Sequence, residues 1–219
     1  STDTIMSYNI GKNGWDTWFS QNDLNALIKI WGRENDSGKM YFNQKFQDYK
    51  FQKSSYGYSI KSIIGYEDIT NINELTFIDK SVDVKDEIIA VFDLLKGIDD
   101  MSSKIYRLYN AAFARFPDYS GLNYWIEQNI KGQDTYKSTA ASFIRSKEFE
   151  STYGKETENK DFITNLYKNI LNRSPDENGY SYWINQLESG KEERWHILMG
   201  FSESQENKSI FVNESGLII

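Results

Sequence analysis

The spacing of apolar residues changes along the chain and divides it into three segments. Near the start, Leu27, Ile28 and Trp31 follow the period of a helix. Between residues 39 and 84, β-branched and aromatic residues dominate, and from about residue 98 the helical period returns. The pattern predicts a mainly α fold with a small β segment.

The middle segment has two strand-like stretches, residues 56–64 and 75–84. They are punctuated by turn residues, Gly65, Asn71 and Asn73. We expect two to four short antiparallel strands, followed by a helix from about Lys85 to Leu95. Residues 39–97 therefore form a β-rich linker that ends in a helix.

The third segment contains an internal repeat. The first copy has Arg115, Pro117, Asp118, Gly121, Tyr124 and Trp125, and the second has Arg173, Pro175, Asp176, Gly179, Tyr182 and Trp183. Identities continue on both sides, so the copies cover about 104–150 and 162–208 of a duplicated helical domain at 98–212. Residues 213–219 form a tail.

Each copy predicts three helices and a short fourth one. In the first copy Pro117 ends a helix, and Asp118 is placed to accept hydrogen bonds from the first turn of the next. Gly121 lies in that turn, where glycine costs helix propensity, so we expect another backbone to approach it closely. Gly132 ends the second helix, a third runs from about residue 134 to 145, and Ser146 caps the last.

The repeated Tyr–Trp pair has two interpretations. Trp125 lies on the apolar stripe of its helix and Tyr124 lies beside it, which favours packing in the core. An aromatic platform for a sugar or peptide is the alternative, and exposure of one ring in both copies favours it. One copy is too small to bury a stable core alone, so we expect the copies to form one cooperative domain with Trp125 and Trp183 buried.

Composition excludes several functional classes. The net charge is -7 and no basic cluster is present, which argues against nucleic acid or an anionic membrane as a partner. No apolar run reaches membrane-spanning length. Because the chain has no cysteine, it has no disulfide, thiolate zinc site or cysteine nucleophile.

The motif Arg-x-Pro-Asp-x-x-Gly-x-x-Tyr-Trp, followed by Phe-x-x-Ser-x-Glu, resembles a helical domain of unknown function similar to the phycobilisome-linker domain. That domain recurs in bacterial secreted proteins and in calcium-binding RTX toxins. The resemblance implies a fold and an extracellular location. It supplies no catalytic residue.

Residues 1–9, Ser-Thr-Asp-Thr-Ile-Met-Ser-Tyr-Asn, resemble the Met-turn of metzincin zinc proteases of the serralysin and matrixin kind. The resemblance implies that Met6 supports the zinc site and that Tyr8 reaches the metal or stabilises the transition state. The helical pattern up to Gly32 resembles the helix that follows this turn, which makes residues 1–38 the end of a catalytic domain. A strand edge before an amphipathic helix is the alternative.

A metzincin site needs three histidines and a glutamate in one motif, yet His196 is the only histidine of the chain. It stands where the first copy has Ser138, and we expect a structural or surface role for it. Zinc ligands, if the protease interpretation holds, lie upstream of Ser1. This chain alone has no complete metal site, and we expect it to be inactive.

Five aspartates raise the question of a calcium site: Asp79, Asp83, Asp86, Asp99 and Asp100. Their spacing fits neither an EF-hand loop nor a nonapeptide repeat, so turns and helix caps are favoured and calcium has weak support.

Two functions remain. In the first, the chain is the C-terminal portion of a secreted bacterial zinc metalloprotease with an accessory helical module, acting on a protein or peptide substrate. In the second, it is a noncatalytic adhesion or binding module for a cell surface or polysaccharide. Both imply an extracellular or cell-surface location.

Overall fold

The computed structural model describes residues 10–11, 14–15, 38–62 and 65–217. Strands β1 (Ile10–Gly11) and β2 (Gly14–Trp15) pair antiparallel. Met6, Tyr8 and the helix expected to end near Gly32 lie outside the described residues.

The middle segment forms two small three-stranded sheets, with six strands in place of the two to four antiparallel ones expected. In chain order the strands are β3 (Lys39–Tyr41), β4 (Lys50–Ser54), β5 (Gly57–Ser62), β6 (Gly65–Asp68), β7 (Glu74–Thr76) and β8 (Ser81–Asp83). One sheet has the order β4-β5-β6 and is antiparallel. The other has the order β3-β7-β8, and its β3–β7 pairing is parallel.

Three strands, β3, β4 and β6, lie outside the stretches predicted as strands. Strand β4 was not predicted, because its Lys50, Gln52 and Lys53 are polar and only Phe51 is buried. Gly65, predicted as a turn, begins β6 with a φ of 119°, a conformation that favours glycine. A short 3-10 helix, η1 (Phe46–Asp48), precedes β4.

The helix predicted for residues 85–95 is present as a π-helical turn, η2 (Val84–Ile89), that continues into α2 (Ala90–Leu94). Asp83 begins it by accepting a hydrogen bond from the Asp86 amide. Ile88, Val91 and Phe92 are buried against the sheets.

The two copies of the repeat contain the same four helices. The first copy has α3 (Met101–Phe113), α4 (Tyr119–Ile130), α5 (Tyr136–Ile144) and α6 (Lys147–Tyr153). The second has α7 (Asn159–Leu171), α8 (Glu177–Glu188), α9 (Arg194–Ser202) and α10 (Gln205–Ser215). Each helix of the second copy begins at the residue equivalent to the start of its counterpart.

The polar residues predicted at the helix starts act as caps. Asp118 and Asp176 accept hydrogen bonds from the amides of Gly121 and Gly179. Ser146 caps α6 in the same way.

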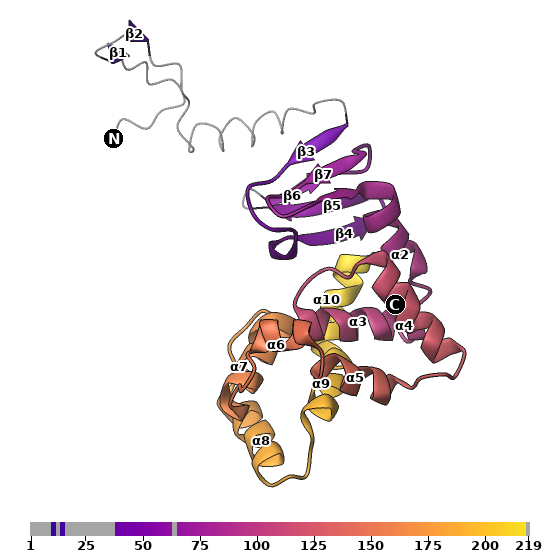
Figure 1. The fold of residues 1–219 in the computed structure, drawn as a ribbon, viewed down its shortest axis with the longest axis vertical. Helices are drawn as coiled ribbons and strands as arrows, with labels where there is room; N and C mark the ends of the chain where they lie inside the picture. The colour runs from indigo at the N-terminus through magenta and orange to yellow at the C-terminus, as the bar shows by residue number, and fades with distance from the viewer. Residues whose placement is uncertain (1–9, 12–13, 16–37, 63–64, 218–219) are drawn as a thin grey trace.

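Two apolar cores join these parts. The first contains the inner faces of both sheets, η2 and α2, together with Ile105, Leu122 and Phe211 from the helices. The second lies among α3 and α5–α9, and Leu108, Phe162 and Leu198 are fully buried in it. Helix α3 contributes to both cores, and α10, yellow in Figure 1, packs against β4 between the strands and the other helices. The chain is therefore mainly α with a small β portion.

Candidate ligand-binding groove

The repeated motif forms the same turn in both copies. Its first helix ends in a left-handed residue, Ala114 or Asn172, each with a φ of 54°. The following arginine reaches the fourth helix, because Arg115 Nε lies 2.5 Å from a Glu148 oxygen and Arg173 Nε lies 2.7 Å from a Glu206 oxygen. The arginine, aspartate and glutamate of the motif thus join three helices of each copy, which is a structural role.

The motif requires glycine because neighbouring side chains lie close to it. The close approach of another backbone, which the sequence led us to expect, is not the reason. A Cβ atom at Gly121 would lie 2.7 Å from Asp118 Oδ1 and 2.9 Å from Tyr109 Oη. At Gly179 it would lie 2.3 Å from Tyr167 Oη. A buried tyrosine hydroxyl therefore occupies the space that any larger residue needs.

Asp118 is held in its ionised form. Burial opposes ionisation, yet hydrogen bonds from Tyr109 Oη and the Gly121 amide, with the nearby Arg115, lower its pKa from 3.8 to about 2. The Tyr109 hydroxyl donates over 2.6 Å, and burial raises the pKa of that tyrosine. The carboxylate form is the one that caps α4.

This arrangement gives a prediction for pH. Because the folded pKa of Asp118 lies below its unfolded value, its contribution to stability is complete above about pH 4 and is lost as the pH falls toward 2. We expect Asp118→Asn to lower the free energy of unfolding at pH 6 by about 1–2 kcal/mol, allowing for partial solvent screening. In urea unfolding, the difference in the free energy of unfolding between the variant and the unsubstituted protein should shrink between pH 4 and pH 2.5. A difference that stays constant over this range would contradict the prediction.

An open groove of about 400 Å³ lies between α8 and α9, with α3 and α5 contributing to its wall. Its lining combines aromatic, charged and small residues: Lys104, Tyr136, Tyr182, Trp183, Glu192, His196, Met199, Gly200 and Glu203. The groove therefore contains the Tyr–Trp pair of the second copy. It also contains the histidine noted in the sequence.

The Tyr–Trp pair is built alike in both copies, and in the second copy it lines the groove. Tyr124 and Tyr182 are each 54% exposed, and their rings meet the neighbouring tryptophan edge-on, with centroids 5.1 and 4.9 Å apart. In the first copy, η2 and α2 pack against α4, and Trp125 contacts both cores. Trp125 and Trp183, expected to be buried, are only partly buried.

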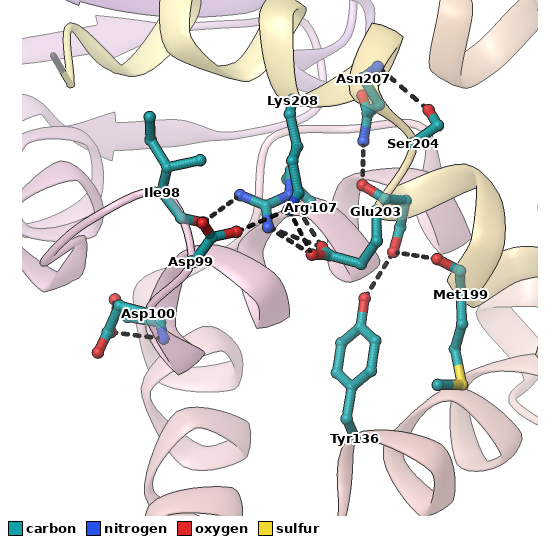
Figure 2. Close-up of polar contacts among 12 residues, drawn as sticks. Ile98, Asp99, Asp100, Arg107, Tyr136, Met199, Glu203, Ser204, Asn207 and Lys208 are labelled. Atoms are coloured by element: carbon teal, nitrogen blue, oxygen red, sulfur yellow. Dashed lines mark hydrogen bonds and ion pairs between the residues drawn. The ribbon is translucent and has the colours of Figure 1, made fainter. Parts of the chain in front are cut away.

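A buried arginine holds one side of the groove. Figure 2 shows the Arg107 guanidinium of α3 directed at Glu203, with Nε and Nη2 donating to the two carboxylate oxygens over 2.9 and 2.8 Å. Its Nη1 donates to the Ile98 carbonyl over 2.8 Å. The Arg107 side chain is 1% exposed, whereas 23% of the Glu203 side chain remains accessible.

Three further contacts fix the same region. Lys208 Nζ lies 2.6 Å from an Asp99 oxygen and 3.7 Å from a Glu203 oxygen. The Tyr136 and Ser202 hydroxyls are 2.5 Å apart, joining α5 to α9. The aromatic ring of Tyr136 is thereby held at the edge of the groove.

His196 of α9 also lines the groove, and 55% of its side chain is exposed. Its Nδ1 contacts a Glu192 carboxylate oxygen, and its ring stacks on Trp195 at a centroid distance of 5.2 Å. Within the described residues, no three histidine or acidic side chains are arranged to hold a metal ion. No helix of the described part of the chain is long and apolar enough to cross a membrane.

Four of the five aspartates considered for calcium have other contacts. Asp100 caps α3 by accepting from the Ser102 amide, and Asp83 caps η2. Asp79 accepts from the Phe46 amide over 2.9 Å, and Asp99 pairs with Lys208.

The sequence did not single out Arg107, Glu192 or Glu203. A signal was present, since the copies differ at the charged pair: Arg107 is replaced by Asn165 in the second copy, and Glu203 stands where the first has Arg145. The pair therefore links the two copies instead of recurring within each. Tyr182 and Trp183 were noted and lie in the groove, while Tyr124 and Trp125 lie elsewhere.

Residues 140–211 match the model of a family described as a domain of unknown function (DUF4214). The match begins within α5 and ends within α10, so it includes both α8 and α9 of the groove. No curated protein matches the chain. No solved structure matches it.

Proposed function

We propose that this chain carries a noncatalytic, extracellular binding module that holds a carbohydrate or peptide in the groove between α8 and α9. The observation that supports it best is the exposed Tyr182 beside Trp183 in a groove of about 400 Å³. Small-molecule sites are typically concave and aromatic, with a few placed polar groups. Glu192, His196 and Glu203 supply such groups here.

The groove residues also favour binding over catalysis. Glu203 is occupied by Arg107, and Glu192 is in contact with His196. The arrangement holds side chains in fixed positions, which lowers the entropy lost when a ligand binds.

The two copies offer a matched test of this proposal. We expect Tyr182→Ala to weaken ligand binding about tenfold, since a lost aromatic contact is worth about 1 kcal/mol or more. Tyr124→Ala, at the equivalent and equally exposed position outside the groove, should leave binding unchanged. Saturation-transfer NMR with a panel of soluble oligosaccharides and short peptides gives the measurement. Equal loss in both variants, or no binding from either class, contradicts the proposal.

The sequence of residues 1–9 favours a second candidate function, in which the module belongs to a secreted zinc metalloprotease. Met6 and Tyr8 would then serve a zinc site completed by upstream histidines, with a protein or peptide as substrate. The helical module would be an accessory or anchoring part of that enzyme.

This candidate predicts that the chain alone has no zinc-dependent peptidase activity, because a single histidine cannot form a three-imidazole site. Casein cleavage and zinc content by atomic absorption give the measurement. Stoichiometric zinc with cleavage would show that the site is assembled in another way. In a longer chain that includes the upstream ligands, Tyr8→Phe should lower kcat more than zinc content.

A further inference from the structure

We infer that the ligand of the groove is an uncharged carbohydrate, with a sugar ring stacked on the Tyr182–Trp183 pair and its hydroxyls bonded to Glu192 and Glu203. This inference rests on the proposed function and specifies its ligand class. Three features of the groove support it: the aromatic faces, the balance of charge and the remaining acceptor atoms.

The aromatic faces fit the shape of a sugar ring. The rings of Tyr182 and Trp183 meet at an interplanar angle of 73°, so the faces of the two rings are nearly perpendicular to each other. Tyr136 contributes another aromatic side chain to the lining. A pyranose carries C–H groups on its faces and hydroxyls around its rim. It can therefore bury its faces against such rings while its rim stays polar.

The charges in the groove are largely compensated by groups of the protein itself. Glu203 is paired with Arg107 and lies near Lys208. Lys104 adds one ammonium group to a lining that also carries the carboxylate of Glu192. A strongly cationic peptide finds its carboxylate partners already occupied, and a polyanion meets two carboxylates and a chain of net charge -7. A neutral ligand needs no free carboxylate as a partner and is not repelled by the negative charges of the chain.

The paired carboxylates still accept hydrogen bonds from a neutral ligand. The side chain of Glu192 is 25% exposed and that of Glu203 is 23% exposed, and each carboxylate has about four acceptor sites. Hydrogen bonds from hydroxyls to ionised carboxylates are among the stronger ones. Because Arg107 and His196 hold the two carboxylates, sugar hydroxyls meet acceptors that are already oriented.

The experiment titrates the intact chain with four probes and follows tryptophan fluorescence and calorimetric heat. Cellohexaose and N-acetylchitohexaose are the neutral probes, an oligogalacturonate is the anionic one and an oligolysine peptide is the cationic one. We expect at least one neutral probe to bind, with an affinity that changes less than twofold between about 0.05 and 0.5 M salt, because no net ion pair forms. The charged probes should not bind in the groove.

The variants connect binding to the groove. Tyr182→Ala should lower the affinity for the neutral probe about tenfold, and Glu192→Gln should lower it several-fold. Tyr124→Ala should have the affinity of the unsubstituted chain. Circular dichroism checks that each variant is folded. Glu192→Gln keeps the size of the side chain and removes its charge, so it is a second variant should Tyr182→Ala disturb the fold.

The outcomes separate this inference from the proposed function. Binding of the oligolysine or oligogalacturonate that is lost in Tyr182→Ala and weakened by salt overturns the carbohydrate inference and leaves a binding groove in place. Failure of both neutral probes overturns the inference as well. If no sugar and no peptide binds in the groove, the proposed function fails with it.

Discussion

Replacement of Arg107 by methionine should lower the free energy of unfolding by about 3–5 kcal/mol, the cost typical of removing one partner of a buried ion pair. The substitution leaves Glu203 without its bidentate partner and the Ile98 carbonyl without its donor. Since Glu203 is 23% exposed, partial hydration of its carboxylate should keep the loss toward the lower end of this range. Chemical denaturation of the intact chain gives the measurement.

Two companion variants separate charge from packing. Arg107→Lys keeps the charge but cannot match the planar fork of the guanidinium, so it should be intermediate. The double variant Arg107→Met with Glu203→Gln removes both charges and should recover part of the loss. A loss below about 1 kcal/mol for Arg107→Met would show that the pair behaves as a surface ion pair.

Arg107→Met should also affect ligand binding in the groove. Glu203 and Tyr136 line the groove, and both are held by contacts around α9 (Figure 2). We expect the folded fraction of Arg107→Met to bind the neutral probe more weakly, because the carboxylate is no longer held in place. Arg107 itself does not line the groove, so its role is to position Glu203.

The helical part of the fold could be predicted from the sequence because its signals are local. Proline, aspartate and glycine mark the helix ends, and Asp118, Asp176 and Ser146 cap the helices as expected. The duplication added a second copy of each signal, so an error in one copy would have been visible in the other.

The sheets were harder to predict, because their strands are short and only partly buried. Strand β4 buries Phe51 against Phe116 of the repeat, a contact between residues far apart in the sequence. Its partner α10 belongs to the second copy, and Gln52 Nε2 bonds the Asn213 carbonyl. Residues this far apart leave no periodic signal in either segment.

The aromatic residues of the candidate site could be predicted from the sequence, but the groove that they line could not. Tyr182 and Trp183 were visible as a repeated pair, but the groove depends on which helices pack against each copy. In the first copy η2 and α2 pack against α4, whereas the described residues place no comparable element on α8. The difference between Tyr124 and Tyr182 therefore arises from tertiary structure, even though their exposed fractions are equal.

The packing of the copies leads to the last prediction. The second core takes Leu108 and Phe143 from the first copy and Leu166 and Phe201 from the second. Helix α9 packs against both α3 and α5, and the ring of Phe149 in α6 contacts that of Phe162 in α7. The second core is therefore built from residues of both copies. Trp125 and Trp183, being only partly buried, are less suitable probes of this core than fully buried side chains.

Leu108 and Leu166 are equivalent positions of the two copies, and both are 0% exposed in the same core. We expect Leu108→Ala and Leu166→Ala each to cost about 2–5 kcal/mol, as cavity-forming substitutions do, which is a large part of the stability of a typical domain. Because α3 also enters the first core, each substitution should move one transition of the whole chain by several degrees, at about 2–4 °C per kcal/mol. Differential scanning calorimetry of the intact chain gives the measurement, with Tyr124→Ala as an exposed control that should shift the transition little. Two resolved transitions, of which only the one belonging to the substituted copy moves, would mean that the copies fold independently and that the shared core contributes little to stability.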